Sequence, residues 1–471
     1  MNLRGRWSAV VFFAAAAAVS AEVAVAATEF RHGPIADPAV VATVPGKSLR
    51  IGIITHAVTD GGVIYVGGQE GVAAIGSDGT PLWATRLPKA DLRMVAVDGS
   101  GVAFVGQNMT AADSDAVAHF FEGTMSTLPT FKDTTVGLLD KGRRGAMLWS
   151  VPLDTTDRAA PPGLSGATLA VTDGATLALL DRTSGTLKKR VQIVPSMLSG
   201  LWMIRGVTRN APLSANESFI VGFLGYLKSV DAVTGNENWS VTNHGLMAAF
   251  VNITAGPILW GDKIVFGNSR NSRSGDWNDA TRVFASDLKG KDLWDDKNDK
   301  HSGVSSLFVQ GDRLFVASNF TLSAYSPNGK QLWTRETAHE DGALTFSAFR
   351  GVRYYLRSEA AAAAETILLK TFGGKESQDP AARTGYGLCL TADDRYVYLS
   401  SVEHSEHHDQ WWVMTHSTKT NGREVVTVLD AATGNYISTL DAKGLVVELL
   451  VAGPNLVVVD FDQVRFFKRP G

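Results

Sequence analysis

The stretch Val230–Val241, VDAVTGNENWSV, places a large aromatic residue immediately after a tight turn. Asp231 opens the turn, Thr234 and Gly235 complete it, and Trp239 follows four residues after the glycine. Glycine adopts a positive φ without steric cost, and Asp and Thr side chains can hydrogen-bond the turn backbone. The stretch therefore predicts a turn that leads into a β-strand carrying a structural tryptophan.

The same arrangement recurs along the chain. Each copy has an apolar strand, a polar turn, a second apolar strand, a glycine turn and then an aromatic residue. The tryptophans are Trp83, Trp149, Trp239, Trp294 and Trp333, and the turn glycines are Gly79, Gly235, Gly329 and Gly434. In two weaker copies we assign Lys189 and Tyr436 to the tryptophan position. We count eight full copies, one of them at Val352–Thr371, and a final half-copy at residues 454–467.

These repeats predict an all-β fold, a β-propeller of four-stranded blades. Alternating apolar residues of period two, in repeats of about 40 to 65 residues, are typical of propeller blades. A four-stranded sheet cannot bury both faces alone, so blades must stack, and we interpret the tryptophans as structural residues that cover the seam to the next blade. We expect Ala39–Val44 to close the ring by pairing with Leu456–Val459 and Gln463–Phe467, so that both termini share one blade.

The pattern LDAxTGxxxW, nearly whole in VDAVTGNENW, resembles the repeat of the PQQ-binding-like, or quinoprotein-type, β-propellers. The resemblance extends over about Ser48 to Phe467 and implies eight blades, with seven or nine as alternatives. That family includes quinoprotein alcohol dehydrogenases and BamB-type outer-membrane assembly proteins, and the repeat alone does not distinguish them.

The first residues predict an export signal. Arg4 and Arg6 precede an apolar run at Ala9–Val19, and the small residues Ala24–Ala26 favour cleavage before Ala27. We therefore assign residues 1–26 to a signal peptide and residues 27–471 to a single propeller domain. We expect this domain to be periplasmic or secreted. The single cysteine, Cys389, offers no site for a lipid anchor near the cleavage point.

Composition argues against several classes of partner. The formal net charge is −3, with 19% charged residues, so no strong field for nucleic acid or membrane follows. We expect no nucleic-acid partner, no transmembrane segment and a monomer, with a protein of the envelope or a secreted protein as partner.

The resemblance raises the question of catalysis. The quinoprotein dehydrogenases imply a PQQ site with Ca²⁺, an Asp base and a disulfide between adjacent cysteines, and a chain with one cysteine cannot form that disulfide. We therefore expect no catalytic residues and no cofactor, with PQQ and Ca²⁺ as the alternative.

Three insertions interrupt the repeats, near residues 108–132, 268–279 and 402–417. The last contains four histidines with carboxylates and two tryptophans: His404, His407, His408, His416, Trp411 and Trp412. Imidazole and carboxylate groups suit Zn²⁺ or Cu²⁺, and the tryptophans suit partner binding, but the spacing matches no established metal motif. A solvated hairpin extension is the simpler interpretation.

Together these observations predict a non-catalytic, exported interaction scaffold similar to the BamB-type proteins. A PQQ-dependent dehydrogenase, or a surface propeller that binds a ligand or metal, is the alternative.

Overall fold

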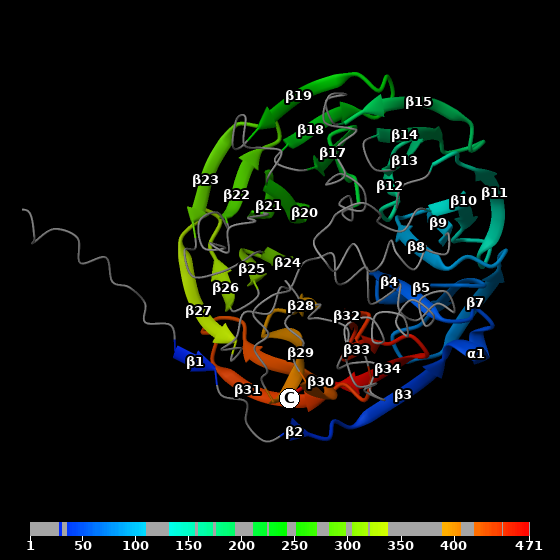
Figure 1. The fold of residues 1–471 in the computed structure, drawn as a ribbon. Helices are drawn as coiled ribbons and strands as arrows, with labels where there is room; N and C mark the ends of the chain where they lie inside the picture. Colours follow the sequence, from blue (N-terminus) through cyan, green and yellow to red (C-terminus); the bar gives the residue numbers. More distant parts are fainter. Residues whose placement is uncertain are drawn as a thin grey trace, which may run out of the picture.

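The computed structural model shows a closed ring of eight β-sheets, which confirms the predicted eight-bladed propeller (Figure 1). The structure describes residues 28–30, 35–109, 131–155, 159–172, 176–193, 211–223, 226–242, 251–270, 282–297, 304–318, 321–337, 389–406, 419–444 and 446–470. The copy predicted at Val352–Thr371 lies outside these residues, and the eight sheets form without it.

In blades 1 to 5 the strands follow the sequence from an inner first strand to an outer last strand. Blade 1 contains β4 (Ile54–Asp60), β5 (Val63–Gly68), β6 (Gly71–Ile75) and β7 (Pro81–Arg86). Blade 2 contains β8 (Leu92–Val97), β9 (Gly101–Met109), β10 (Phe131–Asp140) and β11 (Ala146–Pro152). Blade 3 contains β12 (Gly163–Ser165), β13 (Thr168–Thr172), β14 (Thr176–Asp181) and β15 (Leu187–Gln192). Blade 4 contains β16 (Leu213–Ala215), β17 (Ser218–Phe223), β18 (Tyr226–Asp231) and β19 (Glu237–Thr242).

Blade 5 is also continuous in sequence, and blades 6 to 8 each include one N-terminal strand. Blade 5 contains β20 (Val251–Trp260), β21 (Lys263–Arg270), β22 (Arg282–Asp287) and β23 (Asp292–Lys297). Blade 6 contains β24 (Val304–Gln310), β25 (Arg313–Ser318), β26 (Thr321–Tyr325) and β27 (Gln331–Thr337), with β1 (Thr28–Phe30) outside them. Blade 7 contains β28 (Leu390–Ala392), β29 (Tyr396–Glu406), β30 (Lys419–Asp430) and β31 (Tyr436–Asp441), with β2 (Ile35–Ala36) outside them. Blade 8 contains β32 (Glu448–Ala452), β33 (Asn455–Val459), β34 (Gln463–Lys468) and β3 (Val40–Pro45).

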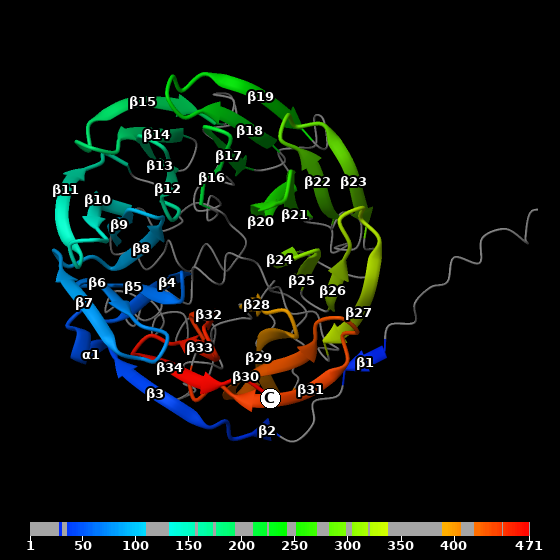
Figure 2. The ribbon, with the colours of Figure 1, turned by 180° about the vertical axis from the view of Figure 1, so that it is seen from behind.

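The ring closes as the sequence predicts. β3 is the outer strand of blade 8 and pairs antiparallel with β34, with Val40 opposite Phe467 and Val44 opposite Val464. The short helix α1 (Gly46–Leu49) follows β3 and leads into blade 1. Before closure, β1 and β2 run parallel to β27 and β31 on the outer perimeter (Figure 2). These two added strands were not predicted.

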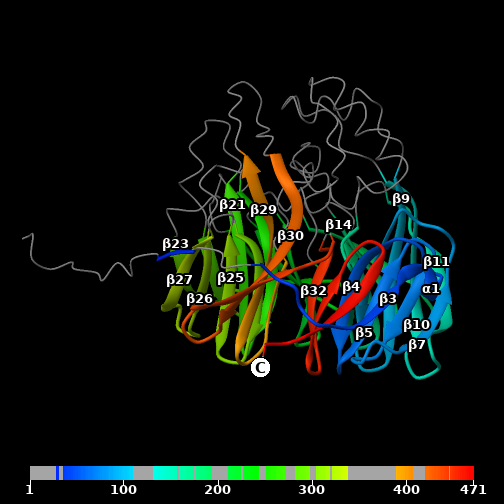
Figure 3. The ribbon, with the colours of Figure 1, turned by 90° about the horizontal axis from the view of Figure 1, so that it is seen from below.

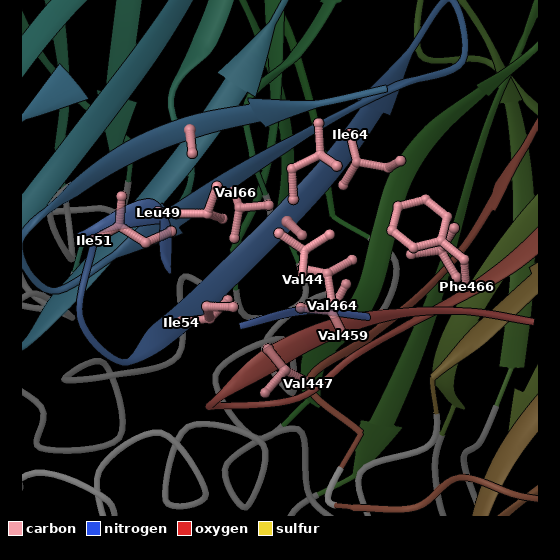
Figure 4. Packing of buried hydrophobic residues seen from close by; sticks show 14 of the residues in the cluster. Val44, Leu49, Ile51, Ile54, Ile64, Val66, Val447, Val459, Val464 and Phe466 are labelled. Carbon is pink, nitrogen blue, oxygen red and sulfur yellow. The ribbon is translucent and has the colours of Figure 1, made fainter. Parts of the chain in front are cut away.

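The core lies between blades rather than within them. Each of the eight seams has its own cluster of buried apolar side chains from two neighbouring sheets. At the closing seam, Val44, Val464 and Phe466 of blade 8 pack with Ile64 and Val66 of blade 1 (Figure 4). Burial of apolar surface at every seam makes the ring mutually supporting, because no blade covers both of its faces alone.

The ring has two unlike faces. The turns between first and second strands, and between third and fourth strands, lie on one face, which we call the turn face. The connections between second and third strands, and those between blades, start and end on the opposite face, which we call the loop face (Figure 3). In the described part of the chain, no helix is long and apolar enough to cross a membrane.

Candidate functional site

The loop face carries the strands that extend furthest from the ring. In blade 7, β29 and β30 pair as far as Glu406 opposite Lys419, and in blade 2, β9 and β10 pair as far as Met109 opposite Phe131. In blade 5, β21 reaches Arg270. In Figure 3 the ends of β9, β21, β29 and β30 lie toward the same side of the ring. The three predicted insertions all leave from these strands, so they start and return on the loop face.

A polar network holds the base of the blade 2 hairpin. Gln107, which is buried, donates from Nε2 to Oγ1 of Thr134 at 2.9 Å and accepts the backbone N–H of Ala159 at 2.8 Å. Asn108 accepts the backbone N–H of Asp91 at 3.3 Å. These bonds join the hairpin to the segment that comes from blade 1 and to the segment that leads into blade 3. They therefore fix the orientation of the base of the hairpin.

Arg93 holds the loop face between blades 1 and 2. Its side chain is buried, its Nε donates to the Gly68 carbonyl at 2.9 Å, and its Nη2 donates to the carbonyls of Gln69 at 3.2 Å and Pro88 at 2.5 Å. The guanidinium also lies 5.4 Å from the ring centroid of Phe104. Burial lowers the pKa of Arg93 to about 10, which leaves the group charged at neutral pH. Three carbonyl dipoles thus solvate a buried charge that sequence patterns gave no reason to expect.

On the turn face, each tryptophan of the repeat lies over the turn glycine of the next blade. A methyl group on Gly185 would lie 2.5 Å from Trp149, one on Gly290 2.7 Å from Trp239, and one on Gly329 2.6 Å from Trp294. Trp83 lies in the same way over Gly145, and Trp333 over Gly434. Four of the indoles also donate from Nε1 to a carbonyl of that next blade: Trp149 to Arg182 at 2.7 Å, Trp239 to Leu288 at 2.9 Å, Trp294 to Pro327 at 3.2 Å and Trp333 to Ala431 at 3.2 Å.

The aspartate of the repeat holds its turn. Oδ1 of Asp231 accepts the backbone N–H groups of Val233 at 3.0 Å and Thr234 at 2.7 Å, and the Thr234 hydroxyl at 2.9 Å. The bonds from Thr234 lower the pKa of Asp231 below its ordinary value. Gly235 has φ 65°, which explains why glycine occupies this position.

At three seams the described residue in the repeat position is not a tryptophan. In blade 3, the stem of Lys189 lies over Gly235, and its ammonium donates to the Thr234 carbonyl and to Asn236 Oδ1, each at 3.1 Å. In blade 8, Ala42 of β3 takes the position and faces Gly79.

At the third of these seams, on blade 7, the structure corrects an assignment made from the sequence. Tyr436 stands two residues after Gly434, whereas each tryptophan stands four residues after its glycine. The register places Ser438 opposite Val428, and Tyr436 packs against the cluster shared with blade 6. The assignment of Tyr436 to the tryptophan position was therefore wrong, and Ser438 occupies it.

Ion pairs and a hydrogen bond hold the connection between blades 7 and 8. Lys443 contacts Asp37 of the N-terminal segment at 2.8 Å and Asp441 of blade 7 at 3.3 Å. Arg465 of β34 pairs with Asp460 and donates to the Lys443 carbonyl. Burial raises the pKa of Asp460 and lowers that of Arg465, each against the opposing effect of its partner.

The C-terminal segment adds a further link. Arg469 contacts Oδ2 of Asp393 at 2.5 Å, and the hydroxyl of Tyr398 donates to the same oxygen at 3.0 Å. Together with the Lys443 and Arg465 contacts, this bond connects the two chain ends to blade 7.

The predicted metal and partner residues are mostly outside the described residues. The residues outside the described part are His407, His408, His416, Trp411 and Trp412. The remaining one, His404, lies on β29 opposite Thr420. Among the residues that the structure describes, no group of three or more His, Cys, Asp or Glu side chains is placed to hold a metal ion. Cys389 is buried, with its Sγ 3.4 Å from the Val447 carbonyl.

Solved structures with the same fold cover almost the whole chain. BamB from Moraxella catarrhalis is 15% identical, covering 92% of this chain and 98% of its own, with a TM-score of 0.55. Saccharomyces cerevisiae Sqt1 is 8% identical, covering 93% and 100%, with a TM-score of 0.54. The designed protein Ika8 is 14% identical, covering 89% and 97%, with a TM-score of 0.52. At these identities the likeness concerns the fold alone. No curated protein matches the sequence.

A family model, described as outer membrane protein assembly factor BamB, matches residues 132–342 and 225–375. The two matches together run from residue 132 to 375, which is more than half of the 471 residues. They contain the repeats with Trp149, Trp239, Trp294 and Trp333. By this match and by its ring of PQQ-like repeats, the chain belongs to the BamB family of β-propellers.

Proposed function

We propose that this chain is a non-catalytic interaction scaffold of the cell envelope that binds a partner protein through its loop face. The observation that carries the proposal is the common direction of the extended strands of blades 2, 5 and 7 on a closed ring. Loops held on a rigid scaffold are where binding residues concentrate. The bonds of Gln107 and Arg93 fix the base of that face and so lower the cost of ordering it on binding.

Family membership and the predicted signal peptide support an envelope location. The family description names an outer-membrane assembly factor, and the export signal at residues 1–26 would deliver the mature chain to the periplasm or outside the cell.

Deletion of the blade 7 hairpin tests the proposal. Residues 407–418 would be replaced by a two-residue turn in the mature chain, and envelope partners would be trapped by cross-linking in cells. Loss of the specific partner, with an unchanged thermal melt, supports the loop face. The matched control is a two-residue insertion between Ser318 and Thr321 in blade 6, where the second and third strands are joined by only two residues.

A melt with PQQ and Ca²⁺ separates the scaffold from the enzyme. A ligand that binds the native state raises the midpoint by mass action. An upward shift, or reduction of a dye in the presence of alcohols, would contradict the non-catalytic assignment. The same melt with Zn²⁺, compared between the intact chain and a His404→Ala, His407→Ala, His408→Ala, His416→Ala variant, tests the metal alternative.

A further inference from the structure

Charge is distributed unevenly around the ring. In blades 2 and 3, the last turn and the outer strand span residues 140–152 and 181–192 and contain seven Lys or Arg residues against two Asp. In blades 4 and 5, the same elements span residues 231–242 and 287–297 and contain three Lys against six Asp or Glu. No other blade has more than one cation in excess in the corresponding elements. The net charge of −3 therefore conceals one basic sector on two neighbouring blades.

Two of the seven cations join blades to one another. Lys141 pairs with Asp60 of blade 1, and Arg182 of blade 3 lies 2.6 Å from Asp98 of blade 2. The other five are exposed, and we call them the basic edge: Arg143, Arg144, Lys188, Lys189 and Arg190. Trp149 of β11 covers the turn that leads into β15, so the cations of the two blades belong to one continuous surface (Figure 2).

The basic edge has few counter-charges. The two aspartates of the sector hold their own turns through backbone N–H groups at 3.0 Å, and they lie 3.4 Å from Arg143 and 3.2 Å from Lys188. The ammonium of Lys189 contacts two neutral oxygens of blade 4. Five exposed cations thus share two carboxylates that are already bonded to the backbone, which leaves the edge with a net positive potential.

The chain departs from its own repeat to place two of these cations. Lys189 occupies the position of the repeat tryptophan. The turn of blade 2 has one residue more between its aspartate and its glycine than the turns of blades 3, 4 and 7, and Arg144 in this turn has φ 54°. Residues other than glycine rarely adopt this conformation, and such strain is concentrated at functional positions. Both departures add positive charge at a cost to the local structure.

Apolar side chains lie among the cations. Met147 is 40% exposed and Leu187 is 44% exposed. Both stand two residues after the turn glycine, where blades 4 and 5 have Glu237 and Asp292. Cations interleaved with apolar side chains suit an anionic membrane, because the cations attract the headgroups and the apolar side chains enter the boundary with the acyl chains.

We propose that the basic edge docks on a membrane surface rich in anionic phospholipid. The edge lies on the convex perimeter of the ring, which a flat and fluid membrane can meet without a matching concave surface (Figure 1). Aromatic anchors dominate contacts between proteins, whereas the one aromatic residue of the sector, Trp149, is buried. The inference goes beyond the proposed function and does not depend on it. The turns of the edge lie opposite the loop face, so membrane and partner protein can be bound together (Figure 3).

Sedimentation with vesicles provides the test. The mature chain would be mixed with phosphatidylcholine vesicles that contain about 30% phosphatidylglycerol, and with vesicles of phosphatidylcholine alone. We expect binding to the anionic vesicles only, weakened by salt because exposed charges are screened. The triple variant Arg143→Gln, Lys188→Gln, Arg190→Gln should bind about a hundredfold more weakly, because each cation near an anionic surface contributes about fivefold.

A matched control removes the same charge elsewhere on the perimeter. Lys289→Gln, Lys291→Gln, Lys330→Gln changes three exposed lysines in the turns of blades 5 and 6 and should leave the affinity unchanged. Met147→Ser should weaken binding, whereas Leu332→Ser, on the outer strand of blade 6, should not. If the first triple variant fails to fold, Arg143→Gln alone keeps the test, since that side chain is 79% exposed; its expected effect is about fivefold.

Several results would overturn the assignment. They are equal binding to phosphatidylcholine alone, the absence of binding to anionic vesicles at low salt, and equal weakening by the two triple variants. Tighter binding of polyglutamate, unaffected by Met147→Ser, would assign the edge to an acidic protein instead. A concentration-dependent dimer that the first triple variant abolishes would assign it to the acidic blades of a second copy. The variant lacking residues 407–418 should bind the vesicles like the parent, so its loss of partner concerns the loop face alone.

Discussion

The indole of Trp333 in blade 6 lies over Gly434 of blade 7, so closely that a methyl group on the glycine would be 2.5 Å from Cε3. The same indole donates to the Ala431 carbonyl at 3.2 Å. One residue thus provides both apolar cover and a hydrogen bond across the seam, and the absence of a side chain on Gly434 makes the approach possible.

Gly434→Ala is expected to destabilise the protein by about 3 kcal/mol, because it adds both backbone strain at positive φ and a clash with the indole. Gly311→Ala is the matched control, since Gly311 has φ 58° with no atom near its added methyl group. That control should cost about 1 kcal/mol. Urea denaturation measures both, and equal losses would show that the indole contact adds nothing.

Lys189→Trp is expected to stabilise the seam between blades 3 and 4 by about 1 kcal/mol, as restoring a repeat consensus commonly does. The lysine stem already lies over Gly235, so the position has the geometry of the other seams. Lys189→Ala removes both the stem and the bond to the Thr234 carbonyl and should be destabilising. If the tryptophan variant melts below the parent, the seam has diverged too far to accept the ring.

Asp460 and Arg465 form a buried pair, with side chains 8% and 5% exposed. Asp460→Asn leaves the guanidinium without its counter-charge and should cost about 3 kcal/mol. The double variant Asp460→Asn, Arg465→Met should be more stable than Asp460→Asn alone, because both desolvated charges are gone. A double-mutant cycle in urea measures the coupling, and strictly additive losses would contradict it.

Asp393 is expected to give the protein part of its sensitivity to acid. Burial acts to raise the pKa of Asp393, but bonds from the Arg395 and Tyr396 N–H groups, Arg469 and Tyr398 outweigh it and hold the pKa below 3.8. A lowered folded pKa stabilises the protein above the unfolded value, and this contribution disappears as the pH falls through 3.8 and then through the folded pKa. Asp393→Asn should therefore flatten the decrease in stability below about pH 4. Urea midpoints between pH 6 and pH 2 measure the slope, and an unchanged slope would remove Asp393 from the acid response.

Truncation separates closure of the ring from its outer cover. Removal of residues 27–38 deletes β1, β2 and the Asp37–Lys443 pair, and should lower the melting temperature by a few degrees while the fold persists. Extending the deletion through Pro45 removes β3 and exposes the apolar side chains of β34 and blade 1. That chain should aggregate or lose cooperative unfolding, and a stable monomer would show that closure is dispensable.

The sequence predicts the fold well because the turn residues of each repeat can be recognised in the sequence. The closing strand at Ala39–Val44 could be named because the final half-copy lacks an outer strand. The Tyr436 assignment was wrong because it followed residue type, whereas the residue four positions after Gly434 is Ser438. Tyr436 and Ser438 are two residues apart but lie opposite Leu429 and Val428, which face different seams, because a β-bulge shifts the register between them.

The long-range contacts were not predictable. The pairs Asp37–Lys443 and Asp393–Arg469 join residues far apart in sequence, and nothing local identifies them. β1 and β2 were missed because two or three residues carry too little periodicity to indicate a strand. Arg93 was missed because a single arginine in an apolar strand gives no hint of the carbonyl groups that surround it. The proposed site residues at 407–416 remain predictions.

The pairing of Val40 with Phe467 has a consequence for the order of assembly. A chain that leaves a ribosome or a translocation channel from its N-terminus presents β3 early, but the strand that accepts it, β34, is the last to emerge. Closing a loop of this length is entropically costly and slow. During that interval the molecule is an open arc with two bare apolar ends, which is the state that a chaperone should recognise.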